Sequence, residues 1–240
     1  MQGYLLLEGG AEFGGQMSEP DRRVIQLAGG PAAHISIVPT AAATDNNHQR
    51  AGRNGVNWFR SLGATNVESL PLIDKASAND PSIANAIRQS GLIYMLGGFT
   101  AYLGETVKGS ASWQAMLEAY INGAVIAGSS AGAMVMCQYY FDPGKRRIVE
   151  GLGLLQNTCV LPHHNTFGKG WVKQLASLLP EVVLLGIDER TGMLDDGEQG
   201  RKVGWSVYGQ ESVTIYRNGL AKVFRNGEGF VDDFRELNRG

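Results

Sequence analysis

The segment Gly128-Ser129-Ser130-Ala131-Gly132 has the pattern of a nucleophile elbow, placed between an apolar run and a helical pattern. A serine at the centre of a sharp strand-to-helix turn has a strained backbone, and glycine two residues away on each side removes a steric clash. The register selects Ser130, because Ser129 would need glycine at positions 127 and 131, where the chain has alanine. The pattern predicts a nucleophilic serine, with the Ala131 amide free to stabilise an oxyanion. A glycine-rich turn that only packs or holds a phosphate is the alternative for the pentapeptide alone.

A serine nucleophile needs a base, and the sequence offers four histidines. His163 and His164 follow an extended apolar run that ends at a proline, which favours extended backbone before it. His34 begins a buried run at the amino end of a strand, and His48 lies in a polar helix start. We therefore expect the base within the pair at 163–164, with a histidine pair in a surface loop as the alternative.

Two places in the sequence offer an acid that could orient the histidine. Asp188 and Glu189 follow the apolar run 182–187, and their side chains would point to opposite faces of a strand, so one is expected to serve. Glu189 is the better placed of the two. Asp142 and Glu150 are rivals, since the chain order serine, acid, histidine is that of α/β-hydrolases. Asp142 precedes Pro-Gly, however, where an aspartate usually caps its own backbone.

The composition of the 240-residue chain is that of a soluble globular protein, with 43% hydrophobic and 18% charged residues. The net charge of −2 gives no indication of a nucleic-acid or membrane partner. No signal pattern or membrane-length apolar run is present, so we expect a cytoplasmic location. No metal-binding motif such as His-Glu-x-x-His occurs, and no metal or cofactor is expected. Cys137 and Cys159 are expected to be buried thiols.

Short apolar runs alternate with helical stretches along most of the chain, which is typical of a parallel sheet with helices on both faces. The expected strands are 3–8, 34–39, 67–72, 91–96, the run into the elbow, and 182–187; the expected helices are 21–27, 48–62, 81–89 and 113–121. Asp80 should cap the third of these helices, and Asp45 or Asn46 the second. Sites in such sheets lie beyond the carboxyl ends of the strands, where the glycine pairs at 9–10 and 97–98 and the elbow fall.

The last part of the chain has a different pattern. The runs 203–208, 213–216 and 220–224 are predicted to be antiparallel strands, and Asn218-Gly219 fits a type I′ hairpin turn. No linker, repeat or low-complexity segment interrupts the sequence. We therefore predict a single α/β domain over 1–240, a three-layer, mostly parallel sheet flanked by helices, with a C-terminal antiparallel β extension.

Taken together, these residues resemble the serine exopeptidase family of dipeptidase E (alpha-aspartyl dipeptidase) and cyanophycinase, in the class I glutamine amidotransferase-like superfamily. The resemblance extends over most of the chain, from the turn at 9–12 to about Thr191. The segments that carry it are Gly9-Gly10-Ala11-Glu12, Gly97-Gly98, the elbow with Ala133, Gly151-Leu152-Gly153-Leu154-Leu155 at the family's spacing before the histidine, and Gly186-Ile187-Asp188-Glu189-x-Thr191.

The resemblance implies a Ser130-His163-Glu189 triad and an oxyanion hole made by the Gly98 and Ala131 amides. His164 falls on a position that is aromatic in the family. The implied activity is hydrolysis of short peptides through an acyl-enzyme, without a metal or cofactor, by a monomer or a homodimer.

Several departures from the family pattern concern substrate selection. Leu161 stands where cyanophycinases have aspartate and dipeptidase E has asparagine, and Phe99-Thr100 replaces polar residues after the glycine pair. The arginines expected after the histidine are missing, and Lys169 is a poorer bidentate partner for a carboxylate. We therefore expect an N-terminal preference broader than aspartate. The candidate substrate-binding residues are Phe99, Thr100, His164, Phe167, Lys169 and Trp171.

Two other functions remain open from the sequence. The glutamate-type triad would suit hydrolysis of the polymer cyanophycin, which the missing polar and basic residues oppose. A non-catalytic binding protein on the same scaffold is the alternative of a different class. A glutamine amidotransferase is disfavoured, because its elbow carries cysteine where this chain has Ser130.

Overall fold

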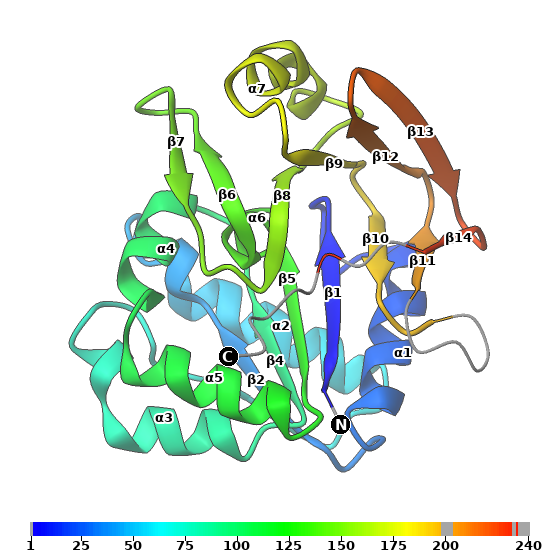
Figure 1. Cartoon of the computed structure of the whole chain (residues 1–240). Coiled ribbons are helices and arrows are strands. Elements are labelled where there is room, and N and C mark those ends of the chain that lie inside the picture. Colours follow the sequence, from blue (N-terminus) through cyan, green and yellow to red (C-terminus); the bar gives the residue numbers. More distant parts are fainter. Residues whose placement is uncertain (1, 198–203, 232–233, 235–240) are drawn as a thin grey trace.

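The computed structural model describes residues 2–197, 204–231 and 234, and two β-sheets with surrounding helices make up the fold (Figure 1). The helices are α1 (Ser18–Leu27), α2 (His48–Ser61), α3 (Pro81–Arg88), α4 (Thr100–Val107), α5 (Ala111–Ile121), α6 (Ala131–Met136) and α7 (Val172–Leu178). Short 3-10 turns are η1 (Gly15–Met17), η2 (Thr40–Ala42), η3 (Ser77–Asn79) and η4 (Gly168–Trp171). None of the described helices combines the length and the apolar character that a membrane crossing needs.

The first sheet has the strand order β14-β11-β10-β1-β5-β4-β2-β3. Its parallel part is β1 (Tyr4–Glu8), β5 (Val125–Ser129), β4 (Leu92–Met95), β2 (His34–Val38) and β3 (Asn66–Ser69). On the other side of β1, antiparallel strands extend the sheet: β10 (Thr191–Leu194), β11 (Trp205–Gly209) and β14 (Gly229–Phe230). β1 therefore lies between the parallel and the antiparallel parts.

The second sheet has the order β13-β12-β9-β8-β6-β7 and lies near the carboxyl end of β1 (Figure 1). β6 (Cys137–Asp142), β8 (Leu155–Leu161) and β9 (Val183–Ile187) are parallel, whereas β7 (Arg147–Glu150), β12 (Ser212–Arg217) and β13 (Leu220–Arg225) pair antiparallel with their neighbours. This sheet brings the carboxyl ends of β8 and β9 together with that of β1.

Alternating side chains on the strands bury both faces of the first sheet. Leu5 and Leu7 of β1 pack with α3, α4 and α5 in one core cluster, whereas Leu6 packs with α1 and α2 in another. Burying a side chain such as Leu6 contributes about 1.5–3 kcal/mol. The resulting helix–sheet–helix layers confirm the predicted α/β fold class, including the helices on both faces.

Several sequence predictions agree closely with the structure. Asp80 caps α3, because its side chain accepts hydrogen bonds from the amides of Ser82 and Ile83. Asn218 and Gly219 both have positive φ, at 52° and 75°, as a type I′ turn between β12 and β13 requires. The expected strand 203–208 is found as Trp205–Gly209, with residue 203 outside the described part of the chain.

Other sequence predictions were wrong in detail. The run 182–187 does not continue the first sheet: it forms β9 of the second sheet, because strands buried on both faces carry the same apolar pattern in either sheet. The cap of α2 is neither Asp45 nor Asn46, since Asn47 occupies that position without a side-chain cap. Helix α4 and the β6–β7 hairpin were not anticipated.

The two cysteines are free, buried thiols, as predicted. Cys137 lies in β6 and Cys159 in β8, both with no exposed surface. Burial raises the pKa of the Cys137 thiol to about 12 and moves that of Cys159 in the same direction. Neither thiol has the anionic character that a reactive cysteine requires.

A pair of acids is fully buried between β1 and α1. Glu8 accepts a hydrogen bond from the Tyr94 hydroxyl, and Asp21 accepts one from the Trp58 indole at 2.7 Å. The second carboxyl oxygen of Glu8 and that of Asp21 have no hydrogen-bond donor while both groups are ionised. When one of the two carboxyl groups carries a proton, the two groups hydrogen-bond to each other. Burial raises the pKa of Glu8 well above its ordinary value, and raises that of Asp21 to about 7. The pair therefore holds a proton at neutral pH.

This proton links stability to pH. Between pH 3.8, the ordinary pKa of Asp21, and about pH 7, the folded state binds more protons than the unfolded state, so the free energy of unfolding falls as pH rises. We expect Asp21→Asn to flatten this fall, because asparagine can still accept from Trp58 and donate to Glu8 without titrating. Urea unfolding at a series of pH values measures the slope.

Glu19→Gln is the matched control, since Glu19 is an exposed carboxyl group in the first turn of the same helix. This variant should keep the wild-type pH dependence. Equal slopes for wild type and Asp21→Asn would show that Asp21 does not contribute to this pH dependence.

Candidate active site

Three consecutive carbonyl groups at the end of β1 hold the segments that carry the predicted triad. The Glu8 carbonyl accepts from the Ser130 amide at 2.9 Å, and the Gly9 carbonyl accepts from the His163 amide at 2.7 Å. The Gly10 carbonyl accepts from the Arg190 amide, next to the predicted acid, at 3.0 Å. Segments distant in the sequence are thereby fixed by one short stretch of backbone.

Ser130 lies at a strained corner between β5 and α6. Its φ of 48° and ψ of −107° place it in a region that non-glycine residues rarely occupy. A Cβ at Gly128 would lie 2.4 Å from the carbonyl carbon of Gly132, and one at Gly132 would lie 2.2 Å from the Met95 oxygen. The two glycines that defined the elbow pattern therefore permit the corner sterically, as the sequence predicted.

The glycine pair after β4 lies against the serine. A Cβ at Gly97 would come within 3.3 Å of the Ser130 Cβ, and Gly98 has a φ of +140°. Within the described residues, neither the Gly98 amide nor the Ala131 amide donates to another protein group. Both predicted oxyanion donors are therefore available to a ligand beside Ser130.

The structure brings the three predicted catalytic side chains together. The Ser130 hydroxyl lies 3.0 Å from Nε2 of His163, and Nδ1 of the same ring lies 2.7 Å from Oε1 of Glu189. The Glu189 amide donates to the side chain of Asn165 at 3.0 Å, which fixes the loop after β9. An ionised glutamate only accepts hydrogen bonds, so the ring proton lies on Nδ1 and Nε2 faces the serine as an acceptor.

The neighbouring pair His164 and Asp188 points the other way and stabilises the scaffold. His164 is 5% exposed, and its ring nitrogens lie 3.0 Å from Asp188 and 2.8 Å from the Tyr216 hydroxyl. Asp188 also accepts from the amide and hydroxyl of Ser212. The hydrogen bonds from His164 and Ser212 lower the pKa of Asp188 against the opposing effect of burial, so it stays ionised. Both ring nitrogens of His164 are engaged, and neither is free for the predicted contact with substrate.

The other predicted substrate-binding residues fall into two groups. Phe167 stacks on the His163 ring with centroids 4.9 Å apart, and Phe99 follows Gly98; both are more than half exposed. Phe167 therefore covers one face of the His163 ring, and Phe99 lines a cavity beside the glycine pair. Trp171 packs behind Phe167 and against Phe141, whereas the Thr100 hydroxyl contacts Met134 at 3.5 Å. Lys169 is exposed in η4.

The rival residues take no part in this cluster. Asp142 accepts from the amides of Gly144 and Lys145 and so caps its own turn, as its Pro-Gly context predicted. Glu150 pairs with Lys108 at the surface, and His34 pairs with Glu68 at the amino end of β2.

Among the described residues, no group of three His, Cys, Asp or Glu side chains is arranged to hold a metal ion.

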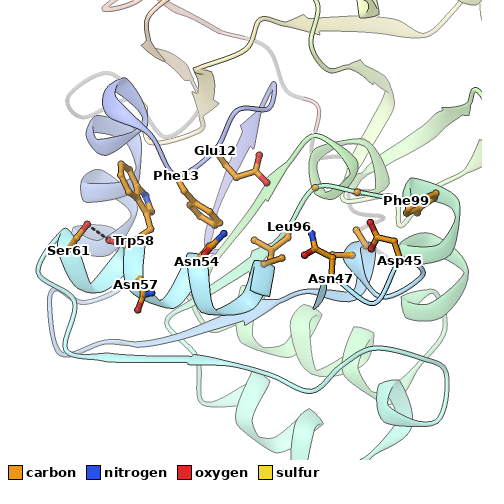
Figure 2. A pocket seen from close by; sticks show the side chains of 15 residues that line it. Glu12, Phe13, Asp45, Asn47, Asn54, Asn57, Trp58, Ser61, Leu96 and Phe99 are labelled. Carbon is orange, nitrogen blue, oxygen red and sulfur yellow. Dashed lines mark hydrogen bonds between the residues drawn. The ribbon is translucent and has the colours of Figure 1, made fainter. Parts of the chain in front are cut away.

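A cavity of about 640 Å³ opens beside the glycine pair (Figure 2). The β1–α1 segment contributes Glu12 and Phe13 to one wall, and α2 with the turn before it contributes the other. The lining residues from α2 and its N-cap follow helical spacing: Asn47, Ala51, Asn54, Trp58 and Ser61, with Asn57 beside them. This stripe was not predicted from the sequence, although its helical spacing is apparent there.

Comparison with known proteins shows to which protein family this chain belongs. Residues 5–203 match the sequence pattern of Peptidase family S51. The chain belongs to Peptidase family S51. Members of this family are serine-type hydrolases, so the peptidase fold and class expected from the sequence are confirmed.

The S51 chain is similar to several cyanophycinases. It is 26% identical over 223 residues to the cyanophycinase of Trichormus variabilis, covering 88% of this chain and 72% of that protein. It is 27% identical over 237 residues to the cyanophycinase of Geminocystis herdmanii, covering 94% and 84%.

Two solved structures resemble this S51 peptidase. A peptidase from an acI-B1 Actinobacterium superposes with a TM-score of 0.84 at 28% identity, covering 97% of this chain and 98% of the other. A putative Peptidase E protein from Listeria monocytogenes superposes with a TM-score of 0.59 at 19% identity, covering 90% and 99%. The second likeness shows a common fold.

The glycine at position 10 of this S51 peptidase makes a test of the site geometry possible. Its φ is +116°, and a Cβ there would lie 2.3 Å from Cε1 of His163. We expect Gly10→Ala to displace the imidazole and lower kcat/KM for peptide hydrolysis by about 100-fold, since small misplacements of reacting groups have that cost. Steady-state kinetics on a cleaved peptide measures the effect.

Gly14→Ala is the control in the same loop, because Gly14 has a φ of −152° and no atom lies within 4 Å of the added Cβ. It should retain wild-type activity. A fully active Gly10→Ala variant would contradict the requirement for close approach between this backbone and His163.

Proposed function

We propose that this S51 peptidase is a serine exopeptidase for short peptides, with Ser130 as nucleophile, His163 as general base and Glu189 as the orienting acid. The observation that carries the proposal is the continuous hydrogen-bond path from the Ser130 hydroxyl through His163 to Glu189, at 3.0 and 2.7 Å. A nucleophile, a base and an orienting acid within hydrogen-bond reach form the arrangement that acyl transfer requires.

The reaction follows from the placement of these groups. His163 Nε2 accepts the hydroxyl proton as Ser130 Oγ attacks the scissile carbonyl carbon, and Glu189 stabilises the imidazolium that forms. The amides of Gly98 and Ala131 donate to the developing oxyanion. His163 then protonates the leaving amine, and water activated by the same ring releases the acyl group from Ser130.

The exposed aromatic rings support a preference wider than N-terminal aspartate. Phe167 stacks on His163 and Phe99 directly follows Gly98, and each offers exposed apolar surface to a substrate side chain. The nearby Lys169 is a single exposed cation rather than a bidentate arginine. Peptides with apolar or varied first residues are therefore the proposed substrates.

Cyanophycin is the second candidate substrate, because the curated relatives are cyanophycinases at 26–27% identity. This candidate involves the same triad and the same acyl-enzyme chemistry. It differs in substrate alone, so a direct comparison of polymer and short peptides separates the two.

The test is a panel of short peptides with varied first residues, together with insoluble cyanophycin, assayed with wild type, Ser130→Ala and Glu189→Gln. We expect wild type to cleave short peptides and Ser130→Ala to lose at least about 10³-fold in kcat, as removal of a triad nucleophile does. Glu189→Gln should lose about 10²- to 10⁴-fold, because the imidazole loses its anionic partner.

Circular dichroism of the variants serves as the folding control. Full turnover by a folded Ser130→Ala protein would refute the assignment of the nucleophile. Release of dipeptides from cyanophycin, without cleavage of short peptides, would transfer the proposal to the second substrate.

A further inference from the structure

Glu12 lies where the catalytic elbow meets the cavity beside the glycine pair. One carboxylate oxygen accepts from the Ser129 hydroxyl at 2.8 Å, and the other would be 3.3 Å from a Cβ at Gly97. Its neighbours Ala11 and Phe13 have positive φ, at 57° and 64°. Phe13 is held by aromatic contacts with Trp58, Phe59 and Tyr94, with ring centroids 5.5–6.4 Å apart. The carboxylate is therefore fixed beside the nucleophile by a constrained loop.

The remaining polar lining of the cavity is acidic or neutral. Asp45 supplies a second carboxylate, and Asn47, Asn54 and Asn57 supply carboxamides that have no hydrogen-bond partner among the described residues. No lysine, arginine or histidine is among the residues that line it, as far as the structure describes the chain. Figure 2 shows Glu12 across the opening from Asn47 and Asn54. A positively charged group with hydrogen-bond donors is the ligand that such a lining favours.

The position of the cavity indicates which part of a substrate would enter it. Gly97 and Gly98 line it, and the Gly98 amide faces the acyl carbonyl in the proposed reaction. His163, which protonates the leaving amine, is not among its lining residues. The acyl part of the substrate, on the amino-terminal side of the cleaved bond, is therefore the part nearest to the cavity.

We infer that this cavity is the subsite for the acyl side of the substrate, with Glu12 as the counter-ion of a cationic nitrogen that the substrate carries there. The inference rests on the proposed function and makes it more specific. The cation is the free α-ammonium group of a short peptide or a basic side chain near its amino terminus. The first source explains selection for an unblocked amino terminus, which an exopeptidase needs.

The experiment compares kcat/KM for matched peptides with free or acetylated amino termini, each with a neutral or an arginine first residue. Glu12→Gln retains an acceptor for Ser129 but removes the charge. We expect it to lower kcat/KM for the free peptides by about tenfold to hundredfold, the loss typical of one hydrogen bond between charged groups, and to leave the acetylated neutral peptide unchanged. If Glu12→Gln lowers kcat/KM only for the arginine peptides, whether acetylated or free, the inference is supported and the arginine side chain is the cation.

Two further variants make the result specific. Asn54→Lys adds a cation to the opposite wall at an exposed helix position, and should reproduce the selective loss without touching the elbow. Glu19→Gln removes an exposed carboxylate outside the cavity and should match wild type. Equal losses on the free, acetylated, neutral and basic peptides in Glu12→Gln would overturn the inference and leave Glu12 as a support of the elbow.

Binding to the inactive Ser130→Ala protein separates this inference from the proposed function. If wild type showed no serine-dependent hydrolysis, the proposed function would fail, and calorimetry with the same peptides would still test the cavity. Tighter binding of peptides that carry the cation, reduced by a second substitution Glu12→Gln, supports the inference. Equal affinities, or no binding of any peptide, overturns it.

Discussion

The site depends on the backbone at the end of β1. The carbonyls of Glu8, Gly9 and Gly10 hold, in turn, the amides of Ser130, His163 and Arg190. A Cβ at Gly9 would lie 2.1 Å from the Asp188 carbonyl oxygen, and one at Gly10 would lie 2.3 Å from Cε1 of His163. The segments can approach this closely only because two glycines carry no side chain, and each hydrogen bond positions one member of the proposed triad relative to the others.

Much of the candidate active site could be proposed from the sequence, because the residues that compose it lie in short local patterns. The elbow glycines at 128 and 132 identified Ser130 through a steric requirement that holds in any protein with this turn. Glu189 and the pair His163-His164 were singled out by their positions after apolar runs, and only the family resemblance selected His163 from that pair. The resemblance to a known family then linked the segments, and the match over residues 5–203 shows that family.

The arrangement of the strands in two sheets could not be predicted in the same way. The runs that form β5 and β9 are both buried on two faces, and their sequences do not specify which strands pair with them. The contacts of His164 could not be predicted for a related reason: they include Tyr216, a residue of β12 that is 52 positions away. The cavity was missed because it needs the tertiary approach of Glu12 to α2, which no local pattern encodes.

The central claim is that Ser130 is an activated nucleophile, and covalent labelling tests it most directly. Native protein would be treated with a fluorophosphonate, which reacts with activated serine hydroxyls, and then digested and mapped by mass spectrometry. The account predicts one modified residue, Ser130, with much slower labelling in His163→Ala and protection by a short peptide. Modification of a different serine, or no modification of correctly folded protein, would contradict the account.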